Sequence, residues 1–426
     1  GDRGFEPRQV VLRVFLVASG EGYVAMPGGL TRVAGPSQEH PGISMQQGSG
    51  SKDTWVLSDQ PNEPQRTALR SEFPTVIRRS TGQISSRVAD NLFWIGRIAE
   101  RSEFTTRILR GVFSRVGAES GFGALSDVAP LWDYLVANGQ LKARPSDSEP
   151  AAQGFEPLEK ALEAVLFDAK LPGSLQHLNG QLHRLGQTSR DSLSIDTWHI
   201  IGRLGESTRD HRVAGMPGRL NDCLPLLDRL VNLHAALSGL SHENFTRTDG
   251  WVFLDLGRRL ERASYSAVLT LRLLRATESH RRAPLDSMLE VFDSSITYRE
   301  RYYFEPRLLP VLDALLLDPT NPRSLAFQIE RLDKLLGKLP IESRQPYSTP
   351  SRAVTARALT QLRTASLSAR DPEEKRACLG EMDRQLTSLI DDLNGISDDL
   401  AEQYFSILIP ELFASEVSAQ QRNSNL

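Results

Sequence analysis

The hydrophobic residues follow a helical period over most of the chain, and this pattern constrains the fold more than any other feature. The first stripe of apolar side chains begins at Ile84 and continues to Phe113. Ser85 or Ser86 provides its N-cap, and Gly117 provides a stop signal. Further stripes lie at 223–240, 252–274, 325–336, 351–369, 372–394 and 397–413. We therefore predict a mainly α fold, with a large multi-helix bundle of about ten helices.

The first sixty residues have a β pattern instead. Val10–Val17 and Gly22–Met26 are rich in β-branched and aromatic residues, and further short strands fit 31–34 and 54–58. A few strands of this length bury too little apolar surface to be stable alone. We therefore expect a small N-terminal β or α+β segment that depends on another part of a protein.

Changes of composition divide the chain into four parts. We predict the β segment at 1–60, a proline-containing linker at 61–83, the helical domain at 84–413 and a flexible tail at 414–426. Inside the helical domain, the Gly-, Pro- and Ser-rich stretches 117–158 and 205–220 are expected to be loops or lids. The pair Asn321-Pro322 is expected to begin a helix, with Asn321 as N-cap.

Composition and charge exclude several classes of protein. With 39% hydrophobic and 24% charged residues, the chain has the composition of a soluble globular protein, and no apolar run is long enough to span a membrane. The net charge of −3 disfavours a nucleic-acid binder. The two cysteines of the chain do not form a disulfide framework, so we expect a cytoplasmic protein. The histidines show no metal-binding spacing, and we predict no metal site.

One short motif occurs twice, 161 positions apart. Gly96-Arg97-Ile98-Ala99-Glu100-Arg101 is repeated as Gly257-Arg258-Arg259-Leu260-Glu261-Arg262, and each copy lies in a helical stripe after a tryptophan. A glycine inside a helix costs about 0.5–1 kcal/mol relative to alanine, which indicates a close approach by another backbone or by a ligand. Glycine and glutamate stand at i and i+4 and share one face of the helix. We therefore expect the two helices to meet and to enclose their acidic and guanidinium groups.

Two interpretations of this repeat remain open. In one, the arginines and glutamates form a structural network that joins two pseudo-symmetric helices. In the other, they line a pocket that binds a carboxylate, a phosphate or an amine. No catalytic residue follows from either interpretation. The candidate substrate-binding residues are Arg97, Glu100, Arg101, Arg258, Glu261, Arg262 and, on a third polar helix, Arg299.

The helical part resembles the alpha-E domain, a bacterial helical domain named for its Glu-Arg motif. The resemblance covers most of 84–410. It departs from the family pattern at Phe104, where a polar residue, typically asparagine, is usual. The segments that carry the resemblance are 86–97 with Glu100-Arg101, 237–247, Trp251 with Glu261-Arg262, Tyr298-Arg299 and 315–324.

The leading segment is similar to the C-terminal end of circularly permuted ATP-grasp proteins, which are often fused to alpha-E domains. The similarity lies in 11–15 and in the run Met26-Pro27-Gly28-Gly29-Leu30-Thr31-Arg32-Val33. Such proteins are thought to be carboxylate–amine ligases that activate a carboxylate as an acyl phosphate with ATP and Mg²⁺. The resemblance implies that Gly28 and Gly29 shape part of a nucleotide cleft, and a tight hairpin is the alternative use of these glycines.

The resemblance implies a helical domain that positions a substrate or partner for an ATP-dependent carboxylate–amine ligase, which forms peptide or amide bonds. The implied partners are the upstream ATP-grasp portion and transglutaminase-like or peptidase-like proteins. ATP and Mg²⁺ are implied only for a complete ATP-grasp domain, so we expect no cofactor on the helical domain and no activity of this chain alone. The alternative is a non-catalytic helical scaffold or protein-interaction domain with a structural Arg–Glu network.

Overall fold

The computed structural model describes residues 10–19, 22–26, 28–33, 50–54, 56–57, 84–116, 122–142, 156–213, 223–276, 281–339 and 349–405. The chain divides into two compact units, 1–80 and 81–426. The predicted linker at 61–83, the stop signal Gly117 and the predicted tail at 414–426 lie outside the described residues.

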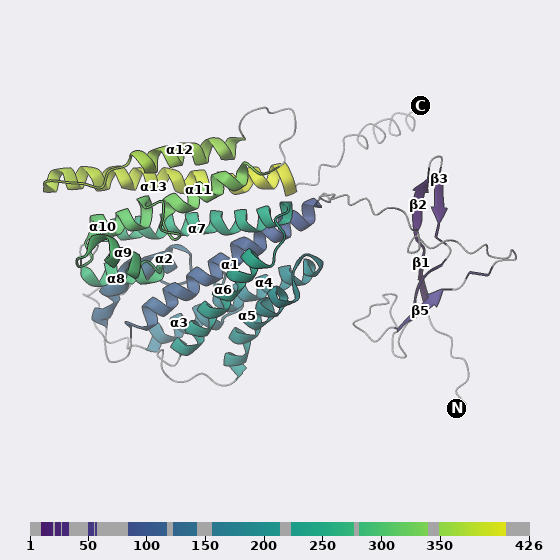
Figure 1. Ribbon diagram of the computed structural model, residues 1–426. Helices are drawn as coiled ribbons and strands as arrows, with labels where there is room; N and C mark the ends of the chain where they lie inside the picture. The colour runs from purple at the N-terminus through teal and green to yellow at the C-terminus, as the bar shows by residue number, and fades with distance from the viewer. Residues whose placement is uncertain are drawn as a thin grey trace, which may run out of the picture. The chain divides into compact units, whose positions relative to one another are not determined.

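The N-terminal unit contains two small antiparallel sheets. In the first, the strands run in the order β1 (Val10–Arg13), β4 (Gly29–Val33), β5 (Gly50–Thr54). The second is the hairpin of β2 (Leu16–Ser19) and β3 (Gly22–Ala25), drawn in purple in Figure 1. All four side chains of β1 are exposed, so this strand has no core of its own.

Two of the strand predictions need correction. The run Val10–Val17 is not one strand, because the chain leaves one sheet after Arg13 and enters the other at Leu16. The strand expected at 54–58 lies at Gly50–Thr54, where Thr54 pairs with Gly29 of β4. Period-two patterns locate strands but do not reveal which partner each residue has, and the partner determines where a strand ends.

The second unit is helical, and the prediction of a mainly α fold with a small N-terminal strand segment is confirmed. None of its described residues forms a strand. The described α-helices are α1 (Ser86–Phe113), α2 (Ala129–Ala137), α3 (Glu156–Phe167), α4 (Leu175–Thr188), α5 (Ile195–Val213), α6 (Leu224–Glu243), α7 (Asp249–Arg275), α8 (Arg282–Val291), α9 (Ser295–Tyr302), α10 (Leu308–Leu312), α11 (Leu325–Leu336), α12 (Pro350–Thr364) and α13 (Pro372–Leu400).

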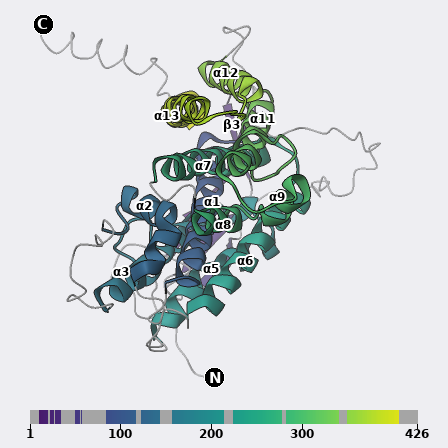
Figure 2. The same ribbon diagram turned by 90° about the vertical axis from the view of Figure 1, so that its left-hand side faces the viewer.

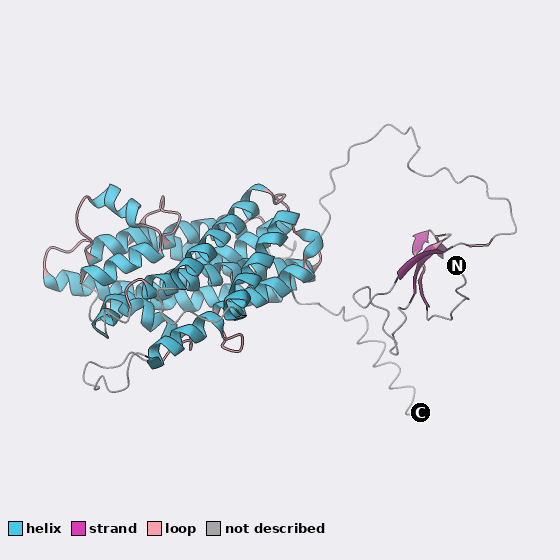
Figure 3. Cartoon of the chain, turned by 90° about the horizontal axis from the view of Figure 1, so that it is seen from below, coloured by secondary structure: helices cyan, strands magenta, loops and turns pink. Residues whose placement is uncertain are grey.

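The two long helices α1 and α7 lie side by side through the centre of this unit (Figures 1 and 2). α4 and α6 pack on α1, whereas α11 and α13 pack on α7 from the other side. Seen from below, the helices form one continuous bundle (Figure 3). Buried leucine, isoleucine, valine and phenylalanine side chains fill the space between them. The two helices that carry the repeated motif are therefore covered on several sides.

The helix starts follow local capping chemistry. The prediction for α1 is confirmed, since the Ser85 side chain accepts a hydrogen bond from the Val88 amide at 3.4 Å. The prediction of Asn321 as a cap is wrong, because α11 begins after Ser324, whose side chain accepts from the Phe327 amide at 3.1 Å. The Asn321 amide is buried and donates instead to the Ala314 backbone oxygen.

Some segments expected to be loops contain helices. The stretch 117–158 contains a 3₁₀ turn at Phe122–Val128, all of α2 and the start of α3, and the stretch 205–220 begins inside α5. Leu131 and Leu135 of α2 are buried in the main core, so tertiary packing outweighs the nearby glycines and prolines. The predicted stripe at 397–413 is no separate helix, because α13 continues to Leu400 and a π-helical turn follows at Ala401–Phe405. None of the described helices is long and apolar enough to cross a membrane.

Candidate functional site

α1 and α7 cross at the glycines of the repeated motif. A methyl group on Gly96 would overlap the backbone oxygen of Leu254 in α7, and one on Gly257 would overlap the backbone oxygen of Phe93 in α1. Each glycine thus lies directly against the backbone of the other helix. Only a residue without a side chain permits this distance, which explains why glycine occupies both helix interiors despite its low helix propensity.

Beyond the crossing, each glutamate binds two arginines of the opposite motif. Glu261 accepts from Arg97 Nε at 2.5 Å and from Arg101 Nε at 2.7 Å. Glu100 accepts from Arg258 Nε at 3.0 Å and from Arg262 Nη2 at 2.6 Å. The two halves repeat the same pairing, so the motifs are related by an approximate twofold axis at the glycines.

We call these two glutamates and four arginines the Glu-Arg network. Glu100 is 2% exposed and Glu261 is 6% exposed, and Arg101 is the most exposed of the six. Burial raises the pKa of Glu261, but the guanidinium groups of Arg97 and Arg101 outweigh it and the net pKa lies below the ordinary value. Glu261 is therefore ionised at neutral pH, and its carboxylate oxygens already accept hydrogen bonds from arginine.

A second acidic centre lies one turn along α1, and no pattern in the sequence predicted it. Glu103 binds Arg107 Nε at 2.9 Å and Arg323 Nη2 at 2.8 Å, and Arg262 Nη2 lies 3.7 Å away. Burial raises the pKa of Glu103, but Arg323, Arg262 and Arg107 hold the net pKa well below its ordinary value. Arg323 joins the centre from the turn before α11, a position that helical periodicity alone does not connect to α1.

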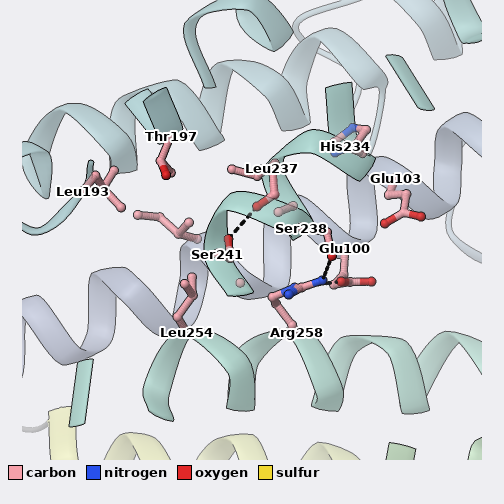
Figure 4. Close-up of a pocket in the computed structure, with 13 residues that line it drawn as sticks. Glu100, Glu103, Leu193, Thr197, His234, Leu237, Ser238, Ser241, Leu254 and Arg258 are labelled. Carbon is pink, nitrogen blue, oxygen red and sulfur yellow. Dashed lines mark hydrogen bonds and ion pairs between the residues drawn. The ribbon is translucent and has the colours of Figure 1, made fainter. Parts of the chain in front are cut away.

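A cavity beside the Arg258–Glu100 pair is too small for a substrate. Figure 4 shows its lining side chains, among them His234 and Glu103 next to the pair. Its volume is about 20 Å³, roughly the space of one water molecule. His234 is buried there, and its ring nitrogen lies 3.1 Å from the Ser102 hydroxyl. Burial lowers the pKa of His234 to about 4, so its imidazole is neutral at pH 7.

A larger pocket opens beside α7. We call it the arginine pocket; its volume is about 410 Å³, within the usual range of about 300–1,000 Å³ for small-molecule sites. Arg258 and Arg262 of the Glu-Arg network border it, and helices α6, α7 and α11 supply most of its wall. The charged residues among the described ones that line the pocket are Arg247, Arg258, Arg259, Arg262, Arg331 and Asp255. The described lining side chains thus have a large excess of positive charge.

The remaining predicted site residues lie outside this network. Arg299 in α9 is exposed, and its side chain donates to the Ser295 backbone oxygen at 3.3 Å. Gly28 and Gly29 belong to the N-terminal unit, where Gly28 has a left-handed φ of 134° and Gly29 begins β4. Phe104 stacks on Tyr265 with ring centroids 3.6 Å apart, so an aromatic contact occupies that position.

The comparison with known families agrees with this core of two Glu-Arg helices. A family model described as a predicted alpha-helical domain with a conserved ER motif, Alpha-E, matches residues 84–405. The chain belongs to the Alpha-E family. Two of its Glu-Arg pairs, Glu100-Arg101 and Glu261-Arg262, provide the cross-paired network described above. The family match does not include the β segment, so the similarity to ATP-grasp proteins remains a prediction.

The curated relatives are longer than this chain. The uncharacterized protein Rv2567 of Mycobacterium tuberculosis is 29% identical over 366 residues, which cover 81% of this chain and 40% of the relative. The uncharacterized protein Mb2597 of Mycobacterium bovis matches with the same identity and coverage. The Alpha-E chain thus spans about two fifths of the length of these relatives. No solved structure matches it.

Proposed function

We propose that the helical domain positions a substrate or a partner for an ATP-dependent carboxylate–amine ligase system that forms peptide or amide bonds. The observation that carries the proposal is the arginine pocket, because guanidinium groups around a cavity match the geometry of carboxylates and phosphates. A carboxylate substrate and its acyl phosphate both carry this chemistry. The partners that this role implies are an ATP-grasp portion and transglutaminase-like or peptidase-like proteins.

In this proposal the Glu-Arg network is the rigid frame of the pocket. Arg258 and Arg262 direct part of their hydrogen-bonding capacity to Glu100 and also border the cavity. A guanidinium group that is already oriented by a carboxylate loses little further entropy when it binds an anion. The predicted site residues of the first motif, Arg97, Glu100 and Arg101, then act by holding α7 in place.

A second candidate is a non-catalytic helical scaffold or protein-interaction domain. The mutual pairing of the motifs favours it, since every carboxylate of the Glu-Arg network binds two arginines and no substrate is needed to satisfy them. The two candidates differ at the rim of the arginine pocket, which is formed by the exposed Arg247 and Arg331. A scaffold does not need Arg247 and Arg331 there, whereas a binding domain does.

The described residues do not fit a complete ATP and Mg²⁺ site. They contain no group of three or more His, Cys, Asp or Glu side chains that could hold a metal ion. The described part of the N-terminal unit comprises only five short strands around Gly28 and Gly29, whereas an ATP-grasp cleft lies between two sheet-bearing lobes. We therefore derive no step through ATP on these residues and assign the activation of the carboxylate to the ATP-grasp portion.

The experiment compares amide formation and ATP consumption in the system that contains this chain together with its ATP-grasp portion. We expect the double variant Arg247→Gln, Arg331→Gln to lose activity by about tenfold or more while the melting temperature stays the same. The control is Arg229→Gln, which removes an exposed arginine on the same helix as the pocket residue Ser238. Unchanged activity of the double variant contradicts the positioning role and favours the scaffold.

A further inference from the structure

The arginine pocket has too few acidic side chains to neutralise the charge of its arginines. Glu100 lies behind Arg258 and Arg262 and binds both. Asp255 is the acidic residue among the described side chains that line the pocket. It lies 3.2 Å from Arg259 Nε and 3.9 Å from Arg258 Nη1, so one carboxylate is shared by two guanidinium groups.

Because Asp255 is shared with Arg258, Arg259 is the least neutralised of the buried arginines that line the pocket. Its side chain is almost fully buried, and its terminal nitrogens face uncharged partners, Gln328 Oε1 at 3.3 Å and His242 Nε2 at 3.4 Å. Burial, together with the positive charges of Arg258 and Arg262, lowers the pKa of Arg259 to about 10 despite the opposing effect of Asp255. An anion in the pocket would supply the missing negative charge.

Two further arginines stand at the rim and are held by aromatic rings. The guanidinium carbon of Arg247 lies 4.1 Å from the centre of the Trp251 ring, and that of Arg331 lies 5.1 Å from the centre of the Phe327 ring. Neither forms an ion pair within 4 Å with another described residue. Stacking uses the flat face of a guanidinium and leaves its edge N–H groups to donate hydrogen bonds. Arg247 uses Nη2 for the His242 backbone oxygen, so its other N–H groups and those of Arg331 can donate to an oxyanion.

The size and charge of the pocket restrict its ligand. Five arginines face one aspartate in the described lining, and Glu100 behind them provides one more negative charge. Glu103 lies 3.7 Å from Arg262, but it also binds Arg107 and Arg323, so an excess of positive charge remains. A ligand with a single charge leaves part of this excess unpaired in a partly buried site. A volume of about 410 Å³ suits a small molecule. The overall charge of −3 does not favour a nucleic acid.

We propose that Arg247, Arg259 and Arg331 form a binding site for a small ligand that carries at least two phosphate or carboxylate groups. This inference rests on the substrate-positioning role proposed above and names the class of ligand. Arg259 contacts one oxyanion group at the base of the pocket, and the two rim arginines contact another through their edge N–H groups. Trp251 and Phe327 fix the rim arginines in place, so the site is largely formed before the ligand arrives.

The test is isothermal titration calorimetry of the 426-residue chain at constant ionic strength. One arm uses inorganic diphosphate as the probe, a second uses citrate, and a third uses chloride as the reference. We expect diphosphate, citrate or both to bind one site, and we expect Arg247→Gln and Arg331→Gln each to weaken that binding by about tenfold or more. Arg229→Gln, the exposed control on α6, should bind like the unchanged chain.

Each outcome decides the inference. Binding of only one probe identifies phosphate or carboxylate as the group that is recognised, and binding of both supports their shared chemistry. Binding no stronger than that of chloride, or an equal loss in Arg229→Gln and the rim variants, overturns it. If the rim variants lose anion binding while the ligase system keeps full activity, the proposed function is contradicted and the anion site stands. If the rim variants lose activity while the unchanged chain binds no anion, the anion site is contradicted and the proposed function stands.

Discussion

Replacing Gly257 with alanine separates intrinsic helix propensity from the packing of α1 on α7. Alanine is the better helix former by about 0.5–1 kcal/mol, so an unconstrained helix position is stabilised by this change. At Gly257 the new methyl group would overlap the Phe93 backbone oxygen, and it would lie 3.1 Å from the Arg97 backbone nitrogen. Neither atom belongs to a flexible side chain, so the two helices must separate.

The cost follows from what the separation disturbs. Restoring normal contact requires a shift of roughly 1 Å, which stretches the Arg97–Glu261 pair of 2.5 Å and the Arg258–Glu100 pair of 3.0 Å. Overpacking costs about 1–3 kcal/mol, and a weakened hydrogen bond to a charged group costs about 1.5–3 kcal/mol. We expect Gly257→Ala to lower the free energy of unfolding by about 3 kcal/mol, whereas helix propensity alone would raise it.

The assay is urea unfolding followed by far-ultraviolet circular dichroism. Gly395→Ala in α13 is the matched control, because a methyl group there meets no atom within 4 Å, and we expect it to stabilise the chain by up to about 1 kcal/mol. Equal stabilisation by Gly257→Ala and Gly395→Ala would refute the close crossing of α1 and α7.

Two further predictions concern buried ionisable groups. His234 has a pKa of about 4 in the folded chain and about 6.5 when unfolded, so the unfolded state binds more protons and stability falls as the pH drops from 6.5 towards 4. Between pH 6.5 and 5 we expect a loss of about 1–2 kcal/mol in urea unfolding, and a pH dependence as steep in His234→Gln would contradict it. Glu103→Gln leaves Arg107 and Arg323 without their carboxylate and should cost about 3–5 kcal/mol, whereas the exposed Glu381→Gln should leave the urea midpoint of unfolding unchanged. Similar losses in the two variants would show that Glu103 has no special role in stability.

Much of the helical core was predictable because its signals are local. The apolar period that starts at Ile84 and the serine at position 85 define α1, and the stripe 252–274 lies within α7. The glycines of the repeated motif predicted a close approach, since no local reason favours glycine inside a helix. The structure shows that the approaching group is the backbone of the other helix.

The rest depends on contacts between residues far apart in the chain. Spacing alone allowed each glutamate to pair with an arginine of its own motif or of the other helix, and only the packing of α1 on α7 selects the other helix. Asn321 looked like an N-cap, but it satisfies the backbone oxygen of Ala314 while Ser324 caps α11. The arginine pocket could not be predicted from the sequence, because Arg247, Arg259 and Arg331 come from three separate segments.

The most direct test of the cross-paired network is the coupling free energy between Arg97 and Glu261, which are 164 positions apart. A double-mutant cycle of Arg97→Met and Glu261→Gln in urea unfolding measures it. The cross-paired network predicts a favourable coupling of about 1–3 kcal/mol, well above that between Arg258 and Glu261 of the same motif. A coupling within about 0.5 kcal/mol of zero would contradict the pairing between the two helices.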